Sequence, residues 1–352
     1  MRVALVGTGF WATNAHLPAL RALKGVEVRV CVGVNLQAAR EFAGEHGIPS
    51  AYGSVQELLA SADRPELVVI ASPDSSHVAA TTLALEAGIP VFCEKPLANH
   101  ASEAQQVAAL AARLGVPATV GYSFRYSPAI QALHRDLRTG ELGEPWLLEL
   151  FEYNAQFHPA LGKPMNWKGD PEHAAAGALF EYGSHVVDIA DWIAGPVEAV
   201  STSLTRVLPG ARLDDIATLQ MRLRPPAIGI LVAGWVLSGS MPGIRIRVHA
   251  SDGLAEVELG ETTPGGQAYR RYALDGSIKS EARLEALGDP YSGYARRHHA
   301  DFIDIVKDEP SAYPGTLPDL SDGAEVQSVL EAALRGTQEW ATVSSVGAAS
   351  PT

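Results

Sequence analysis

The sequence predicts an α/β protein with two domains: a doubly wound parallel sheet, then an α+β domain whose large, mostly antiparallel sheet has one open face. Two observations carry this prediction. The first third of the chain alternates short, wholly apolar runs with helical patterns, and the rest contains longer runs in which apolar and polar residues partly alternate. The 352 residues are enough for two domains of ordinary size.

Residues 1–123 form the first predicted domain. Its strand-like runs are Val3–Val6, Val26–Val32, Leu67–Ala71, Val91–Cys93 and Ala118–Val120. Three of the helical patterns between them are followed by Gly47, Gly88 and Gly115, where a left-handed residue is expected to close the helix. Strands that lack internal alternation and are separated by helices are typical of a parallel sheet covered on both faces.

Residues 124–340 form the second predicted domain, and residues 341–352 form a loose tail. Partly alternating runs such as WLLELFEY, DIATLQMRL and IRIRVHAS indicate an antiparallel sheet with one covered face. Helices are expected near SHVVDIADWIAG, in YARRHHADFIDIVKD and in GAEVQSVLEAALRG. This mixture is typical of an α+β domain.

Charge and composition narrow the classes of partner. The net charge is −13 and the chain contains no basic run, which argues against nucleic acid and against an anionic membrane surface. No window of about 18 apolar residues is free of charge, so no membrane span is expected. The chain opens on a strand pattern rather than on a signal peptide, and Cys31 and Cys93 lie in apolar runs, as buried thiols do in a reducing compartment. We therefore expect a cytoplasmic protein.

The first strand pattern leads directly into GTGFWA, a G-x-G-x-x-A pattern that opens a helix. In a dinucleotide-binding Rossmann unit Gly7 permits the tight turn, Gly9 lets the backbone approach a pyrophosphate, and Ala12 lets helix and strand pack closely. Phe10 and Trp11 lie in the same loop. We predict that these five residues form part of a site for NAD or NADP; the alternative is a glycine turn in some other βαβ unit.

The residues at the end of the second predicted strand do not distinguish NAD from NADP as the cofactor. Gly33 stands where an acid commonly binds the adenosine ribose, and no acid is near it. No Lys or Arg lies immediately beside Gly33 to hold a 2′-phosphate, although Arg40 follows about a turn later. Asn35 is the residue that could bond a ribose hydroxyl. NAD is slightly favoured because the adjacent cation is missing.

Several motifs together resemble the Gfo/Idh/MocA oxidoreductases, the family of glucose–fructose oxidoreductase and inositol dehydrogenase. They are GTGFWA with HLPAL, EHGIPSAYGSVQELL, ASPDSSH, CEKPLA, VGYSFRYSPA and GALFEYGSHVVDIADWIAG, in this order along nearly the whole chain. The resemblance implies a Rossmann domain followed by an α/β domain whose open sheet pairs subunits into a homodimer or homotetramer. It also implies a nicotinamide cofactor and a sugar, inositol or related polyol as substrate.

The CEKPLA motif supplies the first candidate catalytic residue. Lys95 follows a central strand, and ligands of open α/β sheets bind beyond the carboxyl ends of the strands. A cation there can hydrogen-bond a substrate hydroxyl or polarise a ketone. The resemblance gives Lys95 this role, places Glu94 near the nicotinamide ribose and makes the peptide to Pro96 often cis. The alternative is a surface lysine at a strand end.

The second candidate group lies on a helix of the second domain. Glu181 and His185 are four residues apart, and Asp188 follows three residues later, so one helix face carries all three. A histidine is suited to take the proton as hydride leaves carbon, and a carboxylate beside it would tune its charge. The family normally has aspartate where this chain has Glu181. The alternative is an amphipathic helix with a packed histidine and a capping acid.

The resemblance implies further contacts with cofactor or substrate. Ser72, Pro73 and His77 belong to a loop expected along the cofactor, although Ser-Pro-Asp also favours an ordinary turn. Tyr122 and Arg125 are aligned with groups near the nicotinamide or the substrate. Trp167 matches a tryptophan-plus-basic element that can reach the nicotinamide, or it packs in a core or an interface.

The RRHH stretch, residues 296–299, raises the possibility of a metal site. Adjacent histidines point to different sides of a helix, so we predict a solvated helix face and no metal.

Taken together, these patterns predict an NAD(P)-dependent dehydrogenase or ketoreductase acting on a CH–OH group of a sugar, an inositol or a sugar nucleotide. Lys95 would orient and polarise the oxygen, His185 would move the proton, and Glu181 or Asp188 would tune His185. Two alternatives stay open: an NAD-dependent glycoside hydrolase of the same family, and a cofactor-sensing regulator without turnover. A regulator would need neither Lys95 nor His185.

Overall fold

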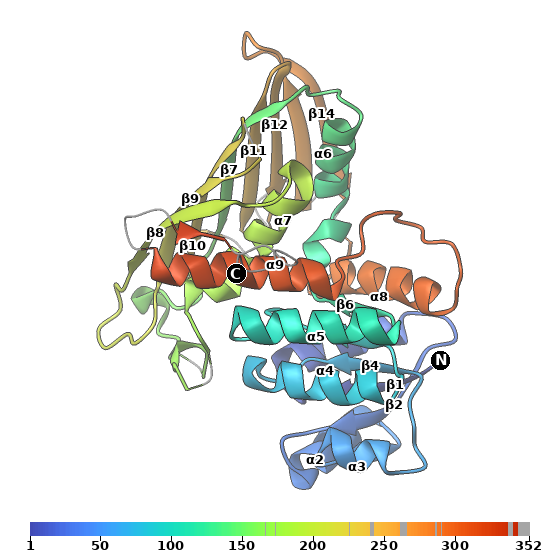
Figure 1. The fold of residues 1–352 in the computed structure, drawn as a ribbon. Coiled ribbons are helices and arrows are strands. Elements are labelled where there is room, and N and C mark those ends of the chain that lie inside the picture. Colours follow the sequence, from blue (N-terminus) through green and yellow to red (C-terminus); the bar gives the residue numbers. More distant parts are fainter. Residues whose placement is uncertain are drawn as a thin grey trace, which may run out of the picture. The chain divides into compact units, whose positions relative to one another are not determined.

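The computed structural model describes residues 1–165, 167–172, 174–224, 226–239, 243–260, 266–285, 287–289, 291–336 and 341–343. The chain forms two compact units. The first contains Met1–Ser123 and Leu287–Ala324, and the second contains Phe124–Ala286 and Glu325–Thr352. Figure 1 shows the elements of both.

A six-stranded parallel sheet forms the centre of the first unit. Its strands are β1 (Arg2–Val6), β2 (Glu27–Val32), β3 (Ser50–Tyr52), β4 (Leu67–Ile70), β5 (Val91–Cys93) and β6 (Ala118–Val120), in the spatial order β3-β2-β1-β4-β5-β6. This is the Rossmann order, with the chain reversing direction across the sheet between β1 and β4. All residues of β4 and β5 are buried, because helices cover both faces.

Helices connect these strands. They are η1 (Ala12–His16, a π-helical turn), α1 (Leu17–Arg21), α2 (Leu36–His46), α3 (Val55–Leu59), η2 (Asp74–Ser76), α4 (His77–Glu86), α5 (Ala101–Leu114) and, later in the chain, α8 (Ser292–Val306). Gly47, Gly88 and Gly115 adopt positive φ after α2, α4 and α5, as the sequence predicts. In Figure 1, α4 and α5 lie side by side. Helix α8 packs on α1.

The second unit is built on a nine-stranded sheet. Its order is β14-β13-β12-β11-β7-β10-β9-β8-β15, and of these pairs only β7 and β10 run parallel among the described residues. The strands are β7 (Pro145–Tyr153), β8 (Ala199–Thr205), β9 (Ile216–Arg222), β10 (Ile228–Gly234), β11 (Ile244–Ala250), β12 (Gly253–Leu259), β13 (Gly266–Tyr272), β14 (Ile278–Glu285) and β15 (Ala341–Thr342).

Burial alternates along these strands, as in β9, because helices pack on one face of the sheet. Helix α6 (Pro128–Arg138) packs on β12 and β13, and α7 (Ser184–Ala194) packs on β7 and β10 (Figure 1). The remaining helical elements are η3 (Ser123–Tyr126), η4 (Pro159–Leu161), η5 (Trp167–Gly169), η6 (Leu179–Gly183, a π-helical turn) and α9 (Leu320–Arg335). The predicted sheet with one covered face is therefore present.

Three features differ from the sequence predictions. Residues 287–324 pack with the first unit although the sequence placed them in the second domain. Within the predicted tail, Ala341–Thr342 pair with β8, whereas residues 344–352 lie outside the described residues. The prediction of a solvated face at RRHH is wrong for its histidines, because His298 and His299 are both fully buried on α8.

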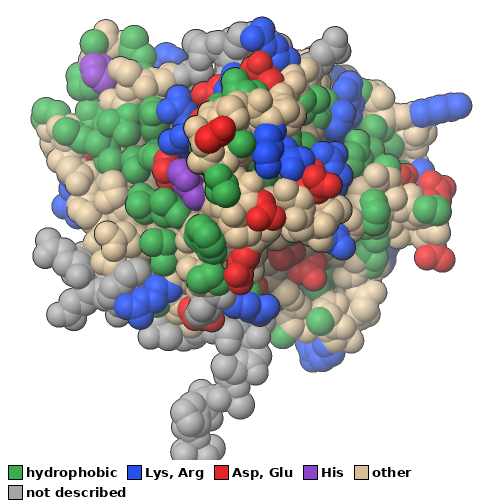
Figure 2. All heavy atoms as spheres, turned by 90° about the horizontal axis from the view of Figure 1, so that it is seen from above, with side chains coloured by type: hydrophobic (Ala, Val, Ile, Leu, Met, Phe, Trp, Pro, Cys, Tyr) green, Lys and Arg blue, Asp and Glu red, His purple; other side chains and the backbone are tan. Residues whose placement is uncertain are grey.

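The described surface carries charge of both signs. Figure 2 shows basic and acidic side chains interspersed on the face that it presents. None of the described helices is long and apolar enough to span a membrane. Cys31 and Cys93 are buried free thiols, as predicted, and burial raises the pKa of Cys31 to about 11.

Candidate functional site at the carboxyl edge of the parallel sheet and on helix α7

The glycine loop follows β1 and is shaped by close backbone contact. Gly7 has φ +116°, and a Cβ at this position would lie 2.3 Å from the carbonyl oxygen of Ala71, which follows β4. Apart from Gly9 and its two chain neighbours, no heavy atom of the described residues lies within 4 Å of the place where a Cβ on Gly9 would stand. The fold therefore requires glycine at position 7, whereas the space beside Gly9 fits a close-approaching phosphate.

The remaining residues of this loop pack in different ways. Ala12 is fully buried in the first turn of the helix, as close packing of helix and strand requires. Phe10 is 55% exposed, and its ring meets Trp11 and Tyr291 edge to face at 5.6 and 5.2 Å between centroids. The aromatic cluster thus presents the Phe10 ring beside the loop, where it could contact a bound nucleotide.

The end of β2 shows why the second strand lacks an acid. A Cβ on Gly33 would lie 2.9 Å from the amide nitrogen of Ala39, so a larger side chain at this position requires the backbone to move. Asn35 caps α2, and its Oδ1 accepts a hydrogen bond from the amide of Ala38 at 2.9 Å. This leaves the side-chain amide of Asn35 as the group that could donate to a ribose hydroxyl.

The loop after β4 is tied to the loop after β5 by His77. This histidine is 1% exposed, and its Nδ1 and Nε2 lie 2.8 and 2.9 Å from the carbonyl oxygens of Pro96 and Ser72. Two carbonyl acceptors require two N–H donors, which only the imidazolium form has. Burial opposes that charge, but the sulfur of Cys93, the carboxylate of Asp74 and the Pro96 carbonyl outweigh it and raise the pKa of His77 to about 10.

His77 was predicted to contact the cofactor, but both of its ring nitrogens are used inside the protein. Its structural role is to join the two loops. In the Ser72 loop, the hydroxyls of Ser72 and Ser76 are hydrogen-bonded at 2.6 Å, and Pro73 precedes the short helix η2. Ser72 and Pro73 are partly exposed and remain predicted cofactor contacts.

Glu94, Lys95 and Pro96 follow β5 at the same edge of the sheet. The peptide between Lys95 and Pro96 is cis, and Lys95 is 5% exposed. The Glu94 carboxylate accepts hydrogen bonds from His16 Nε2 at 3.0 Å and from the Lys95 amide at 3.1 Å. Burial acts to raise the pKa of Glu94, but His16 and the charge of Lys95 outweigh it and lower the pKa below its usual range. An anion and a cation thus stand side by side behind β5.

In the second unit, His185 stands at the start of α7 and Glu181 in the preceding π-helical turn η6. Both are partly exposed, whereas Ser184 and residues 186–188 are buried. The π turn alters the angular offset that an α-helix would give these two side chains. Glu181 forms an ion pair with Lys168, and the His185 ring meets Phe124 edge to face at 4.8 Å.

Lys168 is the basic residue of the predicted tryptophan-plus-basic element, but it was not itself named as a site residue. It follows Trp167 in η5. Trp167 begins η5, but its side chain lies outside the described part of the structure.

Asp188 and Arg125, both predicted at the reaction site, bind each other. The guanidinium Nη2 lies 2.6 Å from Oδ1 of Asp188 and Nε lies 3.0 Å from Oδ2, and both side chains are almost fully buried. Arg125 also lies over the ring of Trp192 at 5.3 Å. The sequence pattern did not indicate this pair, which fixes the inner face of α7. Tyr122, predicted to contact substrate, is 1% exposed in the first unit.

A second anchor, also missed, holds the segment before His185. The Asp214 carboxylate accepts hydrogen bonds from the amides of Gly177 and Leu179 at 2.7 and 2.8 Å. Asp215 likewise accepts from Val207 and Leu208 at 2.7 and 2.8 Å. Two adjacent buried acids therefore order the loops on either side, and the doublet DD directly before a partly alternating strand was the available signal.

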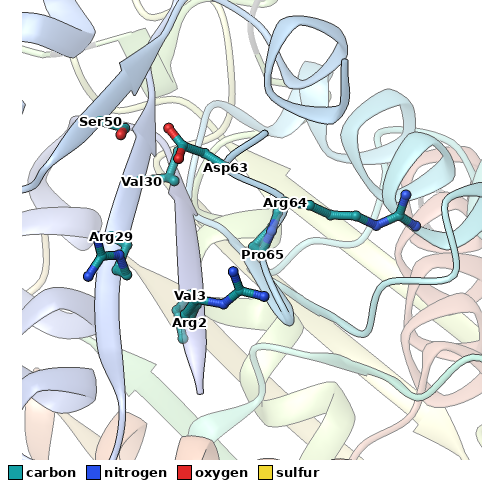
Figure 3. Close-up of a pocket in the computed structure, with 8 residues that line it drawn as sticks. All are labelled: Arg2, Val3, Arg29, Val30, Ser50, Asp63, Arg64 and Pro65. Carbon is teal, nitrogen blue, oxygen red and sulfur yellow. The ribbon is translucent and has the colours of Figure 1, made fainter. Parts of the chain in front are cut away.

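A small cavity of about 30 Å³ lies elsewhere in the first unit, beside the starts of β1 and β3, the middle of β2 and the segment before β4 (Figure 3). Its lining includes Arg2, Arg29, Asp63 and Arg64. It has room for about one water molecule and lies at the amino ends of the strands, opposite the edge where open α/β sheets bind ligands. We therefore assign it no part in the site.

Comparison with known proteins identifies the family. The model described as oxidoreductase family, NAD-binding Rossmann fold, matches residues 1–122, and the model of the Gfo/Idh/MocA C-terminal domain matches residues 130–256. The chain therefore belongs to the Gfo/Idh/MocA oxidoreductases, as the motifs predict. Its first unit is the NAD-binding Rossmann domain of that family.

Among named relatives, D-apiose dehydrogenase of Paraburkholderia graminis is 32% identical over 219 residues, which are 61% of this chain and 56% of that protein's length. Myo-inositol dehydrogenase Hyg17 of Streptomyces leeuwenhoekii is 29% identical over 90% of this chain and 99% of its own. The structure of levoglucosan dehydrogenase in complex with NADH and levoglucosan is 21% identical, with a TM-score of 0.86 over 97% of this chain and 99% of that one. At this identity the structural likeness shows the fold.

Proposed function

We propose that the protein is an NAD(P)-dependent dehydrogenase or ketoreductase that acts on a CH–OH group of a sugar, an inositol or a sugar nucleotide. The observation that carries the proposal is the Glu94–Lys95–Pro96 segment. It stands at the carboxyl end of β5, and His77 ties it to the loop that contacts Gly7. A buried lysine beside an ionised carboxylate supports a chemical role rather than that of a surface strand end.

In this proposal NAD, held by Gly7, Gly9 and the Ser72 loop, supplies the hydride acceptor. Lys95 hydrogen-bonds the substrate oxygen and stabilises the negative charge that develops on it. His185 accepts the hydroxyl proton during oxidation and returns it during reduction. Glu181, paired with Lys168, supports His185 and contacts substrate. The Arg125–Asp188 pair holds α7 in place.

The substrate class follows from the relatives and from the chemistry of Lys95. The named relatives act on apiose and myo-inositol, both of which carry several adjacent hydroxyls. Lys95 as the cation and His185 as the general base would both act on the reacting CH–OH group. Neither role requires a charged group elsewhere on the substrate.

A screen of pentoses, hexoses, inositols and sugar nucleotides tests the proposal, with formation of the reduced cofactor followed by its absorbance. We expect turnover with at least one neutral polyol. Release of sugar without net cofactor reduction would favour the glycoside hydrolase instead, and cofactor binding without any turnover would favour the regulator.

We propose that NAD is favoured over NADP by less than about tenfold, or about 1.4 kcal/mol. Dissociation constants for both at one salt concentration test this, and a preference above about a hundredfold in either direction contradicts it. Asn35→Asp is the informative variant because aspartate also caps helices and would repel a 2′-phosphate. Gly33→Asp would instead strain the backbone against Ala39.

We further propose that the protein is a cytoplasmic homodimer or homotetramer. The support for assembly is the second face of the nine-stranded sheet, where Ile228 and Ile230 of β10 are 51% and 41% exposed. Buried free thiols support a reducing compartment. Light scattering at micromolar concentration measures the assembly, and a mass near 37.2 kDa would exclude it.

A further inference from the structure

Two buried histidines stand behind Glu94. His16 lies at the end of η1 and His299 on α8, and both are fully buried in the first unit. His16 Nε2 lies 3.0 Å from Oε1 of Glu94, and His16 Nδ1 lies 2.8 Å from Nε2 of His299. Three segments distant in sequence thus form one hydrogen-bonded chain, Glu94–His16–His299.

The protons in this chain can be assigned from its geometry. An ionised Glu94 carboxylate only accepts hydrogen bonds, so Nε2 of His16 must carry the hydrogen that it donates. Burial, the largest cause, holds the pKa of His299 well below its usual range, so His299 is neutral. Its Nδ1 is buried without a hydrogen-bond partner among the described residues. A buried ring nitrogen that accepts no hydrogen bond carries a smaller free-energy penalty than a buried N–H without an acceptor. We therefore place the hydrogen on Nε2 of His299, which donates it to His16 Nδ1.

This assignment excludes a proton relay through the chain. Moving a proton from His16 to Glu94 and from His299 to His16 would leave His299 without any ring proton, and no donor in the described part of the chain bonds its Nδ1 to replace that proton. The ring of His299 instead packs on Phe92 at 4.2 Å between centroids. The chain therefore ends inside the core, and its geometry suits holding the carboxylate rather than conducting protons.

The other side of the carboxylate is fixed by backbone. A Cβ on Gly121 would lie 2.7 Å from Oε1 and 3.0 Å from Oε2 of Glu94, so the carboxylate lies directly against this glycine. The Lys95 amide donates to Oε2 at 3.1 Å. The titratable or charged groups that act on Glu94 are His16 and Lys95, and those that act on His299 are His16 and His298.

We infer that His16 and His299 are positioning residues that hold the Glu94 carboxylate as an oriented anion beside Lys95, ready to accept hydrogen bonds from the nicotinamide ribose. This inference rests on the proposed function, because it assigns the anion a ligand in the cofactor site. It gives the HLPAL and RRHH motifs, which lie 283 residues apart at His16 and His299, one shared role.

The test compares four variants in their affinity for NADH as a function of pH. His16→Leu removes the donor to Glu94, and His299→Leu removes the donor to His16. His16→Gln keeps an N–H near the position of Nε2. His298→Leu is the matched control, because His298 is equally buried, is on the same helix and packs on the same Phe92 ring, but bonds Thr119 and Ser123.

We expect His16→Leu to weaken NADH binding at pH 7 by about 10- to 100-fold, since hydrogen bonds to charged groups contribute about 1.5–3 kcal/mol. Loss of the His16 donor raises the pKa of Glu94, so the loss of affinity on acidification should begin at a higher pH than in the parent. His299→Leu should show a smaller change of the same sign, and His16→Gln should recover most of the parent behaviour. His298→Leu should lower the melting temperature but leave the NADH profile unchanged.

Nitrogen-15 spectra of the histidine-labelled parent without ligand provide a readout that needs no variant. We expect His16 and His299 both neutral, with hydrogen on Nε2. An imidazolium signal for His299, hydrogen on Nδ1 of His16, or an unshifted NADH profile in a folded His16→Leu protein would overturn the inference. Failure of the parent to bind NADH would instead contradict the proposed function and leave the nitrogen-15 result to decide the proton assignment.

Discussion

The carboxyl edge of the parallel sheet and the start of helix α7 hold their candidate residues by different means. At the sheet edge, Gly7, Glu94 and Lys95 follow strand ends, and backbone groups fix them: Ala71 limits Gly7, and Gly121 and the Lys95 amide fix Glu94. At α7, ion pairs and buried acids from distant segments hold the chain, with Lys168 on Glu181 and Arg125 on Asp188. The first arrangement depends mainly on close backbone contacts, with added hydrogen bonds from the buried His16 and His77, whereas the second depends on side-chain networks.

A glycine pair provides the sharpest test of the backbone-dependent region. Gly7→Ala should lower the free energy of unfolding by about 3 kcal/mol and abolish NAD binding, because the added methyl meets the Ala71 carbonyl at positive φ. Gly9→Ala should change stability by less than about 0.5 kcal/mol but weaken NAD binding by at least about tenfold. Urea unfolding and calorimetric titration measure the two effects. Equal loss of stability in both variants would contradict the distinction.

The corresponding test at α7 removes a side-chain anchor. Asp214→Asn leaves one of the amides of Gly177 and Leu179 without its carboxylate acceptor, so we expect a loss of about 2 kcal/mol in unfolding free energy. Turnover should fall while NAD affinity stays within about twofold of the parent. A fall in NAD affinity as large as the fall in turnover would show that Asp214 does not act on the α7 region selectively.

His77 makes the sheet edge sensitive to pH. Its folded pKa of about 10 exceeds the ordinary value near 6.5, so its stabilising contribution is complete below about pH 6.5 and is lost as pH rises through 10. We expect stability to fall by about 2 kcal/mol between pH 8 and 9.5, and His77→Gln to flatten this slope. The prediction is tested by measuring the urea midpoint of unfolding for both proteins across that pH range. If the midpoint falls equally steeply with pH in the parent and in His77→Gln, His77 is not an imidazolium in the folded protein.

The smallest expected effect is at the Lys168–Glu181 ion pair, whose two side chains are each 15% exposed. Lys168→Met should raise KM or lower kcat by about tenfold or less, since partly exposed pairs contribute about 1 kcal/mol. Steady-state kinetics with the best substrate of the screen measures it. A loss above about a hundredfold would mean that Lys168 itself takes part in the reaction.

The same contrast explains what the sequence could predict. The carboxyl ends of parallel strands all lie at one edge of the sheet, so the residues after each apolar run could be placed at that edge from pattern alone. The predicted contact of His77 with the cofactor stays a prediction, and its hydrogen bonds to Ser72 and Pro96 depend on how two loops pack together. The local sequence pattern of either loop does not predict how the two loops pack together.

The predictions for α7 were less complete for a related reason. The spacing of Glu181, His185 and Asp188 assumes an α-helix, and the π turn over Glu181 alters it. Asp188 is paired with Arg125, which lies 63 residues earlier in the chain. The spacing of apolar residues along a helix gives no information on such distant pairs. The buried RRHH histidines were misjudged because polar residues usually indicate solvent, and their partners lie on other elements.

The central claim is that Lys95 and His185 act in one proton-coupled hydride step. The most direct measurement is single-turnover cofactor reduction in Lys95→Ala, His185→Ala and the double variant, with NAD affinity determined for each. Each single variant should lose at least about a hundredfold in rate and bind NAD within roughly tenfold of the parent, and the double variant should lose little more than either single one. A folded Lys95→Ala protein that binds NAD and reacts at close to the parent rate, or losses that multiply in the double variant, would contradict the claim.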